Sequence, residues 1–314
     1  MMDWTDRHCR YFHRLLAPNA LLYTEMVTTG AVIHGDRDRL LGFDASEHPV
    51  TLQLGGSDPE ALARASAIGE EFGYDEINLN CGCPSDRVQK GRFGACLMKE
   101  PELVRDCLVS MRESVAVPVT LKTRIGVDEF DSEAFLHRFV DAVVESGIET
   151  LVVHARKAWL SGLSPKENRE IPPLFHERVH ALKRRHPDLT VIVNGGVTAV
   201  DAALGHLEHV DGVMIGRAAY QNPWILAELS AALGWPAADS RETVVEYMAA
   251  YAQRHIESGG RLNHVARHML GLFHGQPGAR HWRRHLSQNM HGDGASAELL
   301  LEAMCGPPAR RAAG

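Results

Sequence analysis

The chain has 314 residues, of which 45% are hydrophobic and 23% charged, as expected for a globular protein with one large domain, or one large and one small. Its formal net charge of −7 argues against indiscriminate nucleic-acid binding, although an average can conceal a basic patch. The sequence shows no apolar run of transmembrane length, no signal-peptide pattern and only six irregularly spaced cysteines, so we expect a reducing cytoplasm and no membrane.

Seven short apolar segments with the character of buried strands recur along the first two thirds of the chain. They are residues 22–26, 50–54, 77–80, 119–122, 151–154, 191–194 and 212–215. Amphipathic segments with helical spacing separate most of them, and another precedes the first. This alternation predicts the α/β class and favours a (β/α)8 TIM barrel over a doubly wound sheet. Because such a barrel has eight strands, we expect a first strand before Met1.

Polar and charged side chains follow nearly every one of these predicted strands. They are Gln53, Asn80, Cys83, Lys122, Arg124, His154, Arg156, Asn194 and Arg217. In a barrel, such positions converge at the C-terminal ends of the strands, where active sites lie. Any one of them could be a capping or turn residue, but so many at equivalent positions favour a site.

Small residues follow the last two predicted strands, in Asn194-Gly195-Gly196 and in Gly216-Arg217. Backbone N–H groups in such turns can approach a phosphate closely, and the arginine supplies a counter-charge. The alternative is two ordinary strand-to-helix turns. The dinucleotide pattern G-x-G-x-x-G is absent after the first predicted strand, which speaks against a Rossmann-type site. We therefore expect a phosphorylated cofactor at the barrel mouth.

The segment around Asn78, Asn80, Cys81 and Cys83 combines two amides on one face of a strand with a Cys-Gly-Cys-Pro turn. A thiol raised out of the sheet beside fixed amides is suited to acid chemistry, although a buried structural cysteine is an equal alternative. Strand alternation places Cys81 on the face opposite the asparagines. The Cys81-x-Cys83 spacing is not that of a zinc knuckle, and we expect no metal.

The strand pattern stops near residue 236, and helical segments are predicted at 241–257, 262–272, 279–289 and 296–304. We therefore predict a catalytic barrel domain at 1–236 and a small helical domain at 237–314. Residues 254–292 contain six arginines, seven histidines and one acid, Glu257. Their densest part carries Arg280, Arg283 and Arg284. Charge runs are usually solvated helix faces, but this patch with an aromatic residue favours contacts to a phosphate backbone.

These motifs are specific enough to compare with known families. The run Asn78-Leu79-Asn80-Cys81-Gly82-Cys83-Pro84-Ser85-Asp86-Arg87-Val88, followed by Phe93-Gly94-Ala95-Cys96-Leu97-Met98, resembles the signature of the tRNA-dihydrouridine synthases. The segments Lys122-x-Arg124-Ile125-Gly126, Val153-His154-Ala155-Arg156, Asn194-Gly195-Gly196 and Gly216-Arg217 occur in the same order in that family. The loop at 159–174 resembles its A subfamily in particular. The family usually carries an aliphatic residue at the position of Cys81, and its catalytic cysteine matches Cys83.

The resemblance implies an FMN-dependent reduction of the C5–C6 double bond of tRNA uridines 20 and 20a, with NADPH as reductant. The flavin N5 would deliver hydride to C6, and Cys83 would protonate C5. The residues implied in binding the cofactor are Met1, Met2, Gln53, Lys122, His154, Asn194, Gly195, Gly196, Gly216 and Arg217. Those implied in binding tRNA are Asn80, Arg124, Arg156, Lys166, Arg169, Arg280, Arg283 and Arg284. We expect a monomer.

Two other functions stay open at this point. An FMN barrel acting on a small molecule, similar to dihydroorotate dehydrogenase, would share the phosphate loops but leave the basic helical segment unexplained. An RNA-binding scaffold without catalysis would retain that segment but not require Cys83, Lys122 and His154.

Overall fold

The computed structural model describes residues 1–85, 88 and 91–304 of the chain. The residues fall into two compact units, one comprising Met1–Met2 and Leu21–Gly216 and the other comprising Asp3–Ala20 and Arg217–Gly314. Asp86 and Arg87 of the signature motif lie outside the described residues. No helix within the described ranges is long and apolar enough to cross a membrane.

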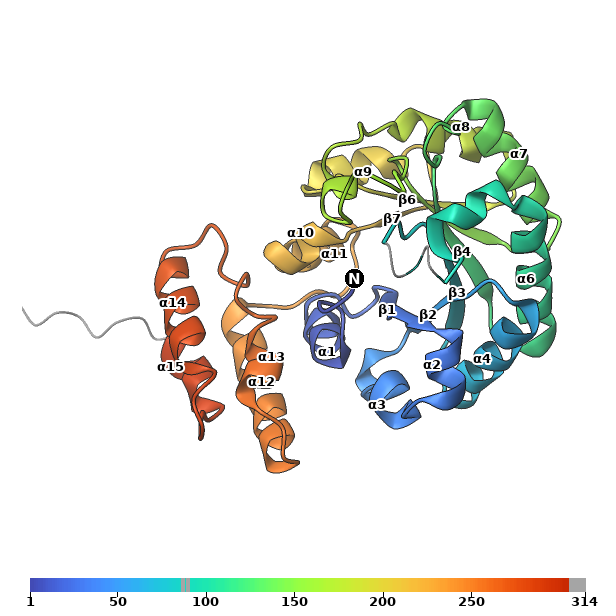
Figure 1. Cartoon of the computed structure of the whole chain (residues 1–314). Helices are drawn as coiled ribbons and strands as arrows, with labels where there is room; N and C mark the ends of the chain where they lie inside the picture. The colour runs from blue at the N-terminus through green and yellow to red at the C-terminus, as the bar shows by residue number, and fades with distance from the viewer. Residues whose placement is uncertain (86–87, 89–90, 305–314) are drawn as a thin grey trace, which may run out of the picture. The chain divides into compact units, whose positions relative to one another are not determined.

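The first unit is a curved sheet of seven parallel strands, each paired with the next in chain order. Helices connect the strands and cover the outer face of the sheet (Figure 1). This arrangement confirms the predicted α/β, TIM-barrel-like fold. The strands are β1 (Leu22–Thr28), β2 (Val50–Gly55), β3 (Glu76–Cys81), β4 (Val119–Arg124), β5 (Thr150–His154), β6 (Thr190–Asn194) and β7 (Gly212–Met214). Its helices are α2 (Thr29–His34), α3 (Arg37–Leu41), η1 (Ala45–Glu47), α4 (Pro59–Glu71), η2 (Gly94–Lys99), α6 (Pro101–Ser114), α7 (Glu133–Val144), η3 (Glu167–Arg169), α8 (His176–Arg185) and α9 (Val200–Leu207).

Helix α4 shows how local sequence fixes these connections. Asp58 caps its start by accepting from the Ala61 N–H at 2.7 Å, and Pro59 occupies the first turn, where no N–H is needed. Gly69 lets the helix approach the sheet, because a Cβ there would lie 2.7 Å from Leu52 and 2.8 Å from Ile77. Ile77 therefore faces the helices, and the alternate residues of β3 face the barrel interior.

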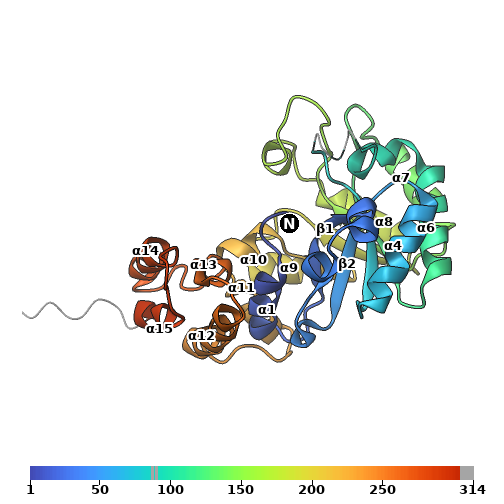
Figure 2. The ribbon, with the colours of Figure 1, turned by 60° about the horizontal axis from the view of Figure 1, so that its bottom comes forward.

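The second unit consists of helices around a separate apolar core. Phe12 and Leu16 of the N-terminal helix pack in that core with Val245, Trp282 and Leu300 from the C-terminal helices. Figures 1 and 2 show α12, α14 and α15 side by side. The helices are α1 (Arg7–Leu16), α10 (Arg217–Gln221), α11 (Ile225–Ala232), α12 (Arg241–Glu257), α13 (Leu262–Ala266), α14 (Ala279–Asn289) and α15 (Glu298–Met304).

Two features of the second unit differ from the expectations. Its residues include 3–20 and 217–236, which the predicted boundary after residue 236 assigns to the barrel domain. Residues 3–20 belong to it because α1 is amphipathic and buries its apolar side among the C-terminal helices. The predicted helix at 262–272 ends at Ala266, and turns follow it. Gly271 lies in those turns, where a Cβ would come within 2.4 Å of the Gln221 carbonyl oxygen.

Candidate active site

The turn that carries Cys83 is held by the side chain of Asn80. Asn80 Oδ1 accepts from the backbone N–H groups of Gly82 and Cys83, at 3.1 and 3.0 Å. The Cys83 side chain is partly exposed and forms no disulfide, whereas Cys81 is fully buried. Burial raises the pKa of Cys81 far above its usual range. Its neighbour Cys107 belongs to helix α6, so Cys81 faces the outer, helix-covered side of the sheet. The strand thus separates an accessible thiol from an inaccessible one.

A ladder of amides inside the barrel fixes the direction in which Asn80 points. Its Nδ2 donates to Gln53 Oε1 at 2.8 Å, and Gln53 Nε2 donates to Asn78 Oδ1 at 2.9 Å. Asn78 Nδ2 then donates to Thr120 Oγ1, and that hydroxyl donates to Glu76 Oε1, both at 2.8 Å. Each amide or hydroxyl in the ladder donates one of these hydrogen bonds and accepts another, so no single amide can flip without breaking the bonds to its neighbours. Gln53, which we predict to contact the cofactor, has both ends of its amide engaged in this ladder.

Glu76 terminates the ladder at the opposite end from Cys83. Its Oε1 also accepts from Tyr23 Oη at 2.9 Å and from Thr51 Oγ1 at 3.2 Å. Burial raises the pKa of Glu76, and the three hydroxyl donors oppose this shift by stabilising the carboxylate.

Arg124 connects the Cys83 turn to the loop after β5. Its Nε donates to the Gly82 carbonyl at 2.8 Å, and its Nη1 donates to the carbonyls of Lys157 and Asn168 at 3.0 and 3.1 Å. The residue is only 5% exposed, and burial lowers the pKa of its guanidinium to about 10. Asn168 is itself fully buried and bonds to the backbone of Trp159. Arg124, predicted from the resemblance to bind substrate, has at least this structural role.

We expect that Arg124→Lys lowers the free energy of unfolding by about 3 kcal/mol, because a lysine cannot reach three carbonyls and leaves buried acceptors unpaired. Denaturant titration of the variant measures the loss. Arg138→Lys, at an exposed position of α7, is the matched control and should change stability little. Equal stability of the two variants would contradict the role of Arg124 as a connector.

Lys122 and His154 lie in a strongly basic environment at the ends of β4 and β5. Burial, and then the charge of Arg124, lower the pKa of Lys122 to about 8. The pKa of His154 is well below its usual range because of burial and the positive charges of Arg124, Lys122 and Arg156. His154 is therefore neutral, and its buried Nδ1 has no hydrogen-bond partner among the described residues. A buried nitrogen without a partner among several cations is suited to an electron-rich polar ligand.

The turn after β6 requires glycine at two positions, where its backbone lies close to the side chains of His154 and Leu174. Gly195 and Gly196 have φ values of 105° and 77°, which disfavour any other residue. A Cβ at Gly195 would lie 2.9 Å from the His154 ring, and one at Gly196 would lie 2.4 Å from Leu174. His176 Nε2 lies 2.7 Å from the Gly195 carbonyl oxygen and fixes the turn from behind. The close-lying backbone of this glycine turn and the unpaired His154 nitrogen are compatible with the phosphorylated flavin that the family resemblance implies.

The remaining predicted cofactor residues are placed as follows. Asn194 Nδ2 donates to the Met214 carbonyl at 2.8 Å, so its side chain joins β6 to β7. Met1 lies beside Gly216, where a Cβ would be 3.5 Å from the methionine sulfur. Arg217 begins helix α10 and belongs to the second unit, as do Arg280, Arg283 and Arg284, whereas Met2 belongs to the first.

Three of the predicted tRNA-binding residues belong to the loop after β5. Arg156 is half-buried and its Nη1 donates to the Pro172 carbonyl. Lys166 is exposed and Arg169 is half-buried in the short helix η3. The loop therefore presents Lys166 to solvent while Arg156 is bound to its backbone.

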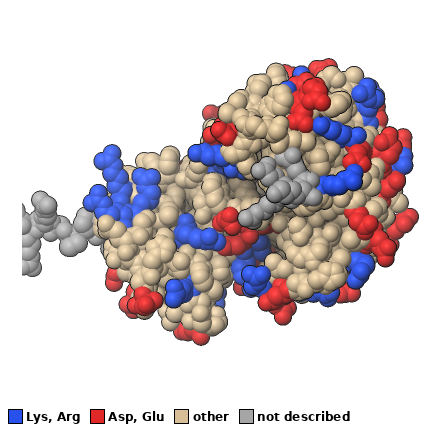
Figure 3. Space-filling model, in the orientation of Figure 1, with Lys and Arg blue, Asp and Glu red and all other residues tan. Residues whose placement is uncertain are grey.

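Helix α14 of the second unit separates apolar from basic residues. Trp282 and Leu286 are buried, and Trp282 Nε1 donates to the Met269 carbonyl at 2.9 Å. Arg280, Arg283 and Arg284 are all exposed. Figure 3 shows Lys and Arg side chains gathered where α14 lies in Figure 1. The helix is thus anchored by its tryptophan and offers a charged surface.

Comparison with known proteins decides the family. The family described as "Dihydrouridine synthase (Dus)" matches residues 1–305. This chain belongs to the dihydrouridine synthase family. The family membership predicted from the Asn78–Met98 motifs is confirmed.

Relatives with established names extend along nearly the whole chain. A "tRNA-dihydrouridine(20/20a) synthase" of Shewanella oneidensis is 59% identical over 302 residues, which cover 96% of this chain and 90% of that protein. Proteins of the same name are 58% identical over 303 residues in Xanthomonas campestris pv. campestris and 57% over 312 residues in Vibrio cholerae. They cover 96% and 98% of this chain, and 90% and 95% of their own lengths. The resemblance to the A subfamily agrees with these names.

Several residues that shape the site of this dihydrouridine synthase are missed by sequence reasoning. They are Glu76, Thr120, Asn168 and His176. Glu76 could have been found from the sequence, because it alternates with Asn78 and Asn80 and all three share the inner face of one strand. Asn168 and His176 act on backbone groups elsewhere in the chain, and no local pattern marks them.

Proposed function

We propose that this chain reduces the C5–C6 double bond of uridines 20 and 20a in tRNA, with FMN as cofactor and NADPH as reductant. The observation that carries the proposal is the partly exposed thiol of Cys83, held by Asn80 in a chain of the dihydrouridine synthase family. The basic surroundings of Lys122 and His154 and the glycine turn after β6 support it.

The cofactor would be held by residues in or directly after the five strands β2, β4, β5, β6 and β7, and by the first two residues of the chain. Backbone N–H groups of Gly195, Gly196 and Gly216, with Arg217, would bind the phosphate. Gln53, Lys122 and His154 would contact the ring or ribityl chain, Asn194 would shape the turn, and Met1 and Met2 would contribute backbone. When bound, FMN supplies the hydride that is added to C6 of uracil.

Cys83 would donate the proton to C5. A general acid must reach its substrate and must also recover a proton afterwards, and a partly exposed side chain allows both. Cys81 cannot do so because it is fully buried. Asn80, by holding the backbone N–H groups of Gly82 and Cys83, would fix the thiol in place for this transfer.

The nucleotide has to leave the stacked tRNA to reach this thiol, at a cost of a few kcal/mol that contacts elsewhere would offset. Asn80, Arg124 and Arg156 would hold the extruded nucleotide. Lys166 and Arg169 on the loop after β5 would contact the tRNA near it. Arg280, Arg283 and Arg284 would bind its backbone, which makes residues 237–314 a tRNA-binding domain. We also propose that the protein is a monomer and that it lies in the cytoplasm.

The test uses the purified full chain under anaerobic conditions. We expect a yellow protein that NADPH bleaches and that regains colour on addition of unmodified tRNA but not of orotate or free uridine. Recovery of colour with orotate would overturn the tRNA assignment in favour of a small-molecule oxidoreductase similar to dihydroorotate dehydrogenase. Colourless protein that binds tRNA would favour the non-catalytic scaffold.

The low pKa of Lys122 predicts a pH dependence of FMN binding. In the FMN-free chain its ammonium group prevails below pH of about 8 and is lost above it, whereas an ordinary lysine stays charged to about 10. We therefore expect the affinity for FMN, measured by fluorescence titration, to fall as the pH rises through about 8. Lys122→Met should bind FMN more weakly and without this pH step. A step retained in the variant would assign it to another group.

A further inference from the structure

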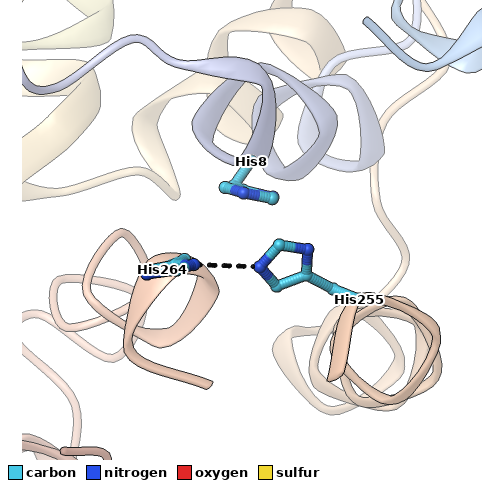
Figure 4. A group of neighbouring side chains, drawn as sticks. All are labelled: His8, His255 and His264. Atoms are coloured by element: carbon cyan, nitrogen blue, oxygen red, sulfur yellow. Dashed lines mark hydrogen bonds between the residues drawn. The ribbon is translucent and has the colours of Figure 1, made fainter. Parts of the chain in front are cut away.

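Three histidines from distant parts of the sequence meet within the second unit, apart from the residues discussed so far. His8 lies in α1, His255 in the last turn of α12 and His264 in α13 (Figure 4). One ring nitrogen of each lies within 4.8 Å of those of the other two. His8 is buried, His255 half-buried and His264 exposed, so the group opens to solvent on one side.

The rings meet through their nitrogen-bearing edges. His255 Nε2 and His264 Nδ1 are 3.1 Å apart, and the planes of these two rings are inclined by 59°. The planes of His8 and His255 are inclined by 62°, with 4.4 Å between ring centroids. Nitrogen ligands of a tetrahedral Zn²⁺ are about 3.3 Å apart, because Zn–N bonds are about 2.0 Å. The His255–His264 pair has nearly this spacing already.

The residues around the cluster hold the rings in this arrangement. His8 Nδ1 lies 2.7 Å from Tyr251 Oη, which leaves Nε2 of His8 as its available ligand atom. The backbone of His8 is held by Asp6, which accepts from its N–H at 3.0 Å. Asp6 also pairs with Arg267 and His268, just beyond α13. This network ties α1 to the end of α13.

His255 is held from its other side by the turn that follows α12. Gly260 donates its N–H to the His255 carbonyl at 2.9 Å, and a Cβ at Gly260 would lie 2.2 Å from His255 Nε2. Only glycine allows the chain to approach the ring so closely. Burial lowers the pKa of His255, and that of His8 to about 3. Asp6, Arg7 and His268 are the other titratable groups acting on His8.

We propose that His8, His255 and His264 bind one divalent transition-metal ion, with Zn²⁺ the best match and water as a fourth ligand. Three imidazole nitrogens form a ligand set that Zn²⁺, Cu²⁺ and Ni²⁺ accept. The ion would fasten α1 to α12 and α13 within the second unit. No local pattern in the sequence would mark such a site, because 247 residues separate His8 from His255.

The test compares metal binding by the full chain and two variants after removal of bound metal with a chelator. We expect one equivalent of Zn²⁺ by calorimetry, tetrahedral Co²⁺ absorption in the visible range, and a higher Tm with Zn²⁺. His264→Ala should weaken Zn²⁺ binding at least 100-fold and abolish the Tm response. Because His264 is exposed, the metal-free variant should fold like the metal-free parent, which circular dichroism and Tm will check.

His206→Ala is the matched control. His206 forms a similar pair with His180, at 3.2 Å, but this pair belongs to the first unit and has no third ring in ligand geometry among the described residues. The control should retain the full equivalent of Zn²⁺ and the Tm response. Absence of saturable binding in the parent, unchanged binding in His264→Ala, or equal loss in both variants would overturn the proposal.

Discussion

Replacing Cys83 with alanine is expected to reduce dihydrouridine formation in tRNA by about 10²–10⁴-fold, the usual contribution of a general acid. The side chain is partly exposed at the C-terminal end of β3, so its removal should leave the barrel and the glycine turn after β6 unchanged. FMN binding should therefore persist. Single-turnover assays with prereduced enzyme and unmodified tRNA, read out as dihydrouridine content, measure the effect independently of flavin reduction by NADPH.

Cys81→Ala is the matched control, since it removes the same thiol group two residues earlier. Cys81 is fully buried on the outer face of the strand, and its loss should cost about 1 kcal/mol of stability through a small cavity. Dihydrouridine formation should continue at nearly the parental rate below the melting temperature. Activity that survives in Cys83→Ala but is lost in Cys81→Ala would reverse the assignment of the acid.

Replacing Arg280, Arg283 and Arg284 together with alanine is expected to weaken tRNA binding on the order of 100-fold. All three are exposed on α14, while Trp282 between them is buried and keeps the helix in place. Removing an arginine that binds a phosphate also reduces the number of counterions released on binding. A plot of log Kd against log salt concentration should therefore become shallower by about 2–3, as fluorescence anisotropy with labelled tRNA can measure.

A control variant that removes positive charge elsewhere distinguishes the effect of the α14 arginines on tRNA binding from the effect of net charge. Arg105 and Arg185 lie on α6 and α8 and already pair with Asp106 and Asp141, both at 2.9 Å or less. The double alanine variant should bind tRNA within about threefold of the parent, because arginines already paired with carboxylates contribute little to counterion release. An equal loss in the control and the triple variant would mean that net charge, and not α14, governs binding.

The parts of the fold that follow from local periodicity are predictable from the sequence. All seven strands lie close to their expected positions because each is a short apolar segment between turn residues, and alternation alone places Cys81 and Asn80 on opposite faces of β3. The predicted helix at 262–272 is wrong beyond Ala266, since the close approach of Gly271 to Gln221 overrides local propensity.

The site itself is only partly predictable, for a related reason. The residue types at the strand ends predict an active site, but the roles of Gln53 and Arg124 depend on partners in other strands and loops. The register that sets Gln53 opposite Asn78, and Asn80 opposite Lys122, has no local signature in the sequence. For the same reason, the convergence of His8 with His255 and His264 is visible only in the folded chain.

The amide ladder in the barrel has a polarity set at one end. Glu76 accepts hydrogen bonds from the hydroxyls of Tyr23, Thr51 and Thr120, so Thr120 must turn its lone pair toward Asn78. That choice is passed on from amide to amide until Asn80 is left with its oxygen facing the Cys83 turn. A carboxylate at the far end of the strand from the thiol thus determines which way the last amide faces. Glu76 thus acts on the turn of the proposed acid, Cys83, only through a series of hydrogen bonds.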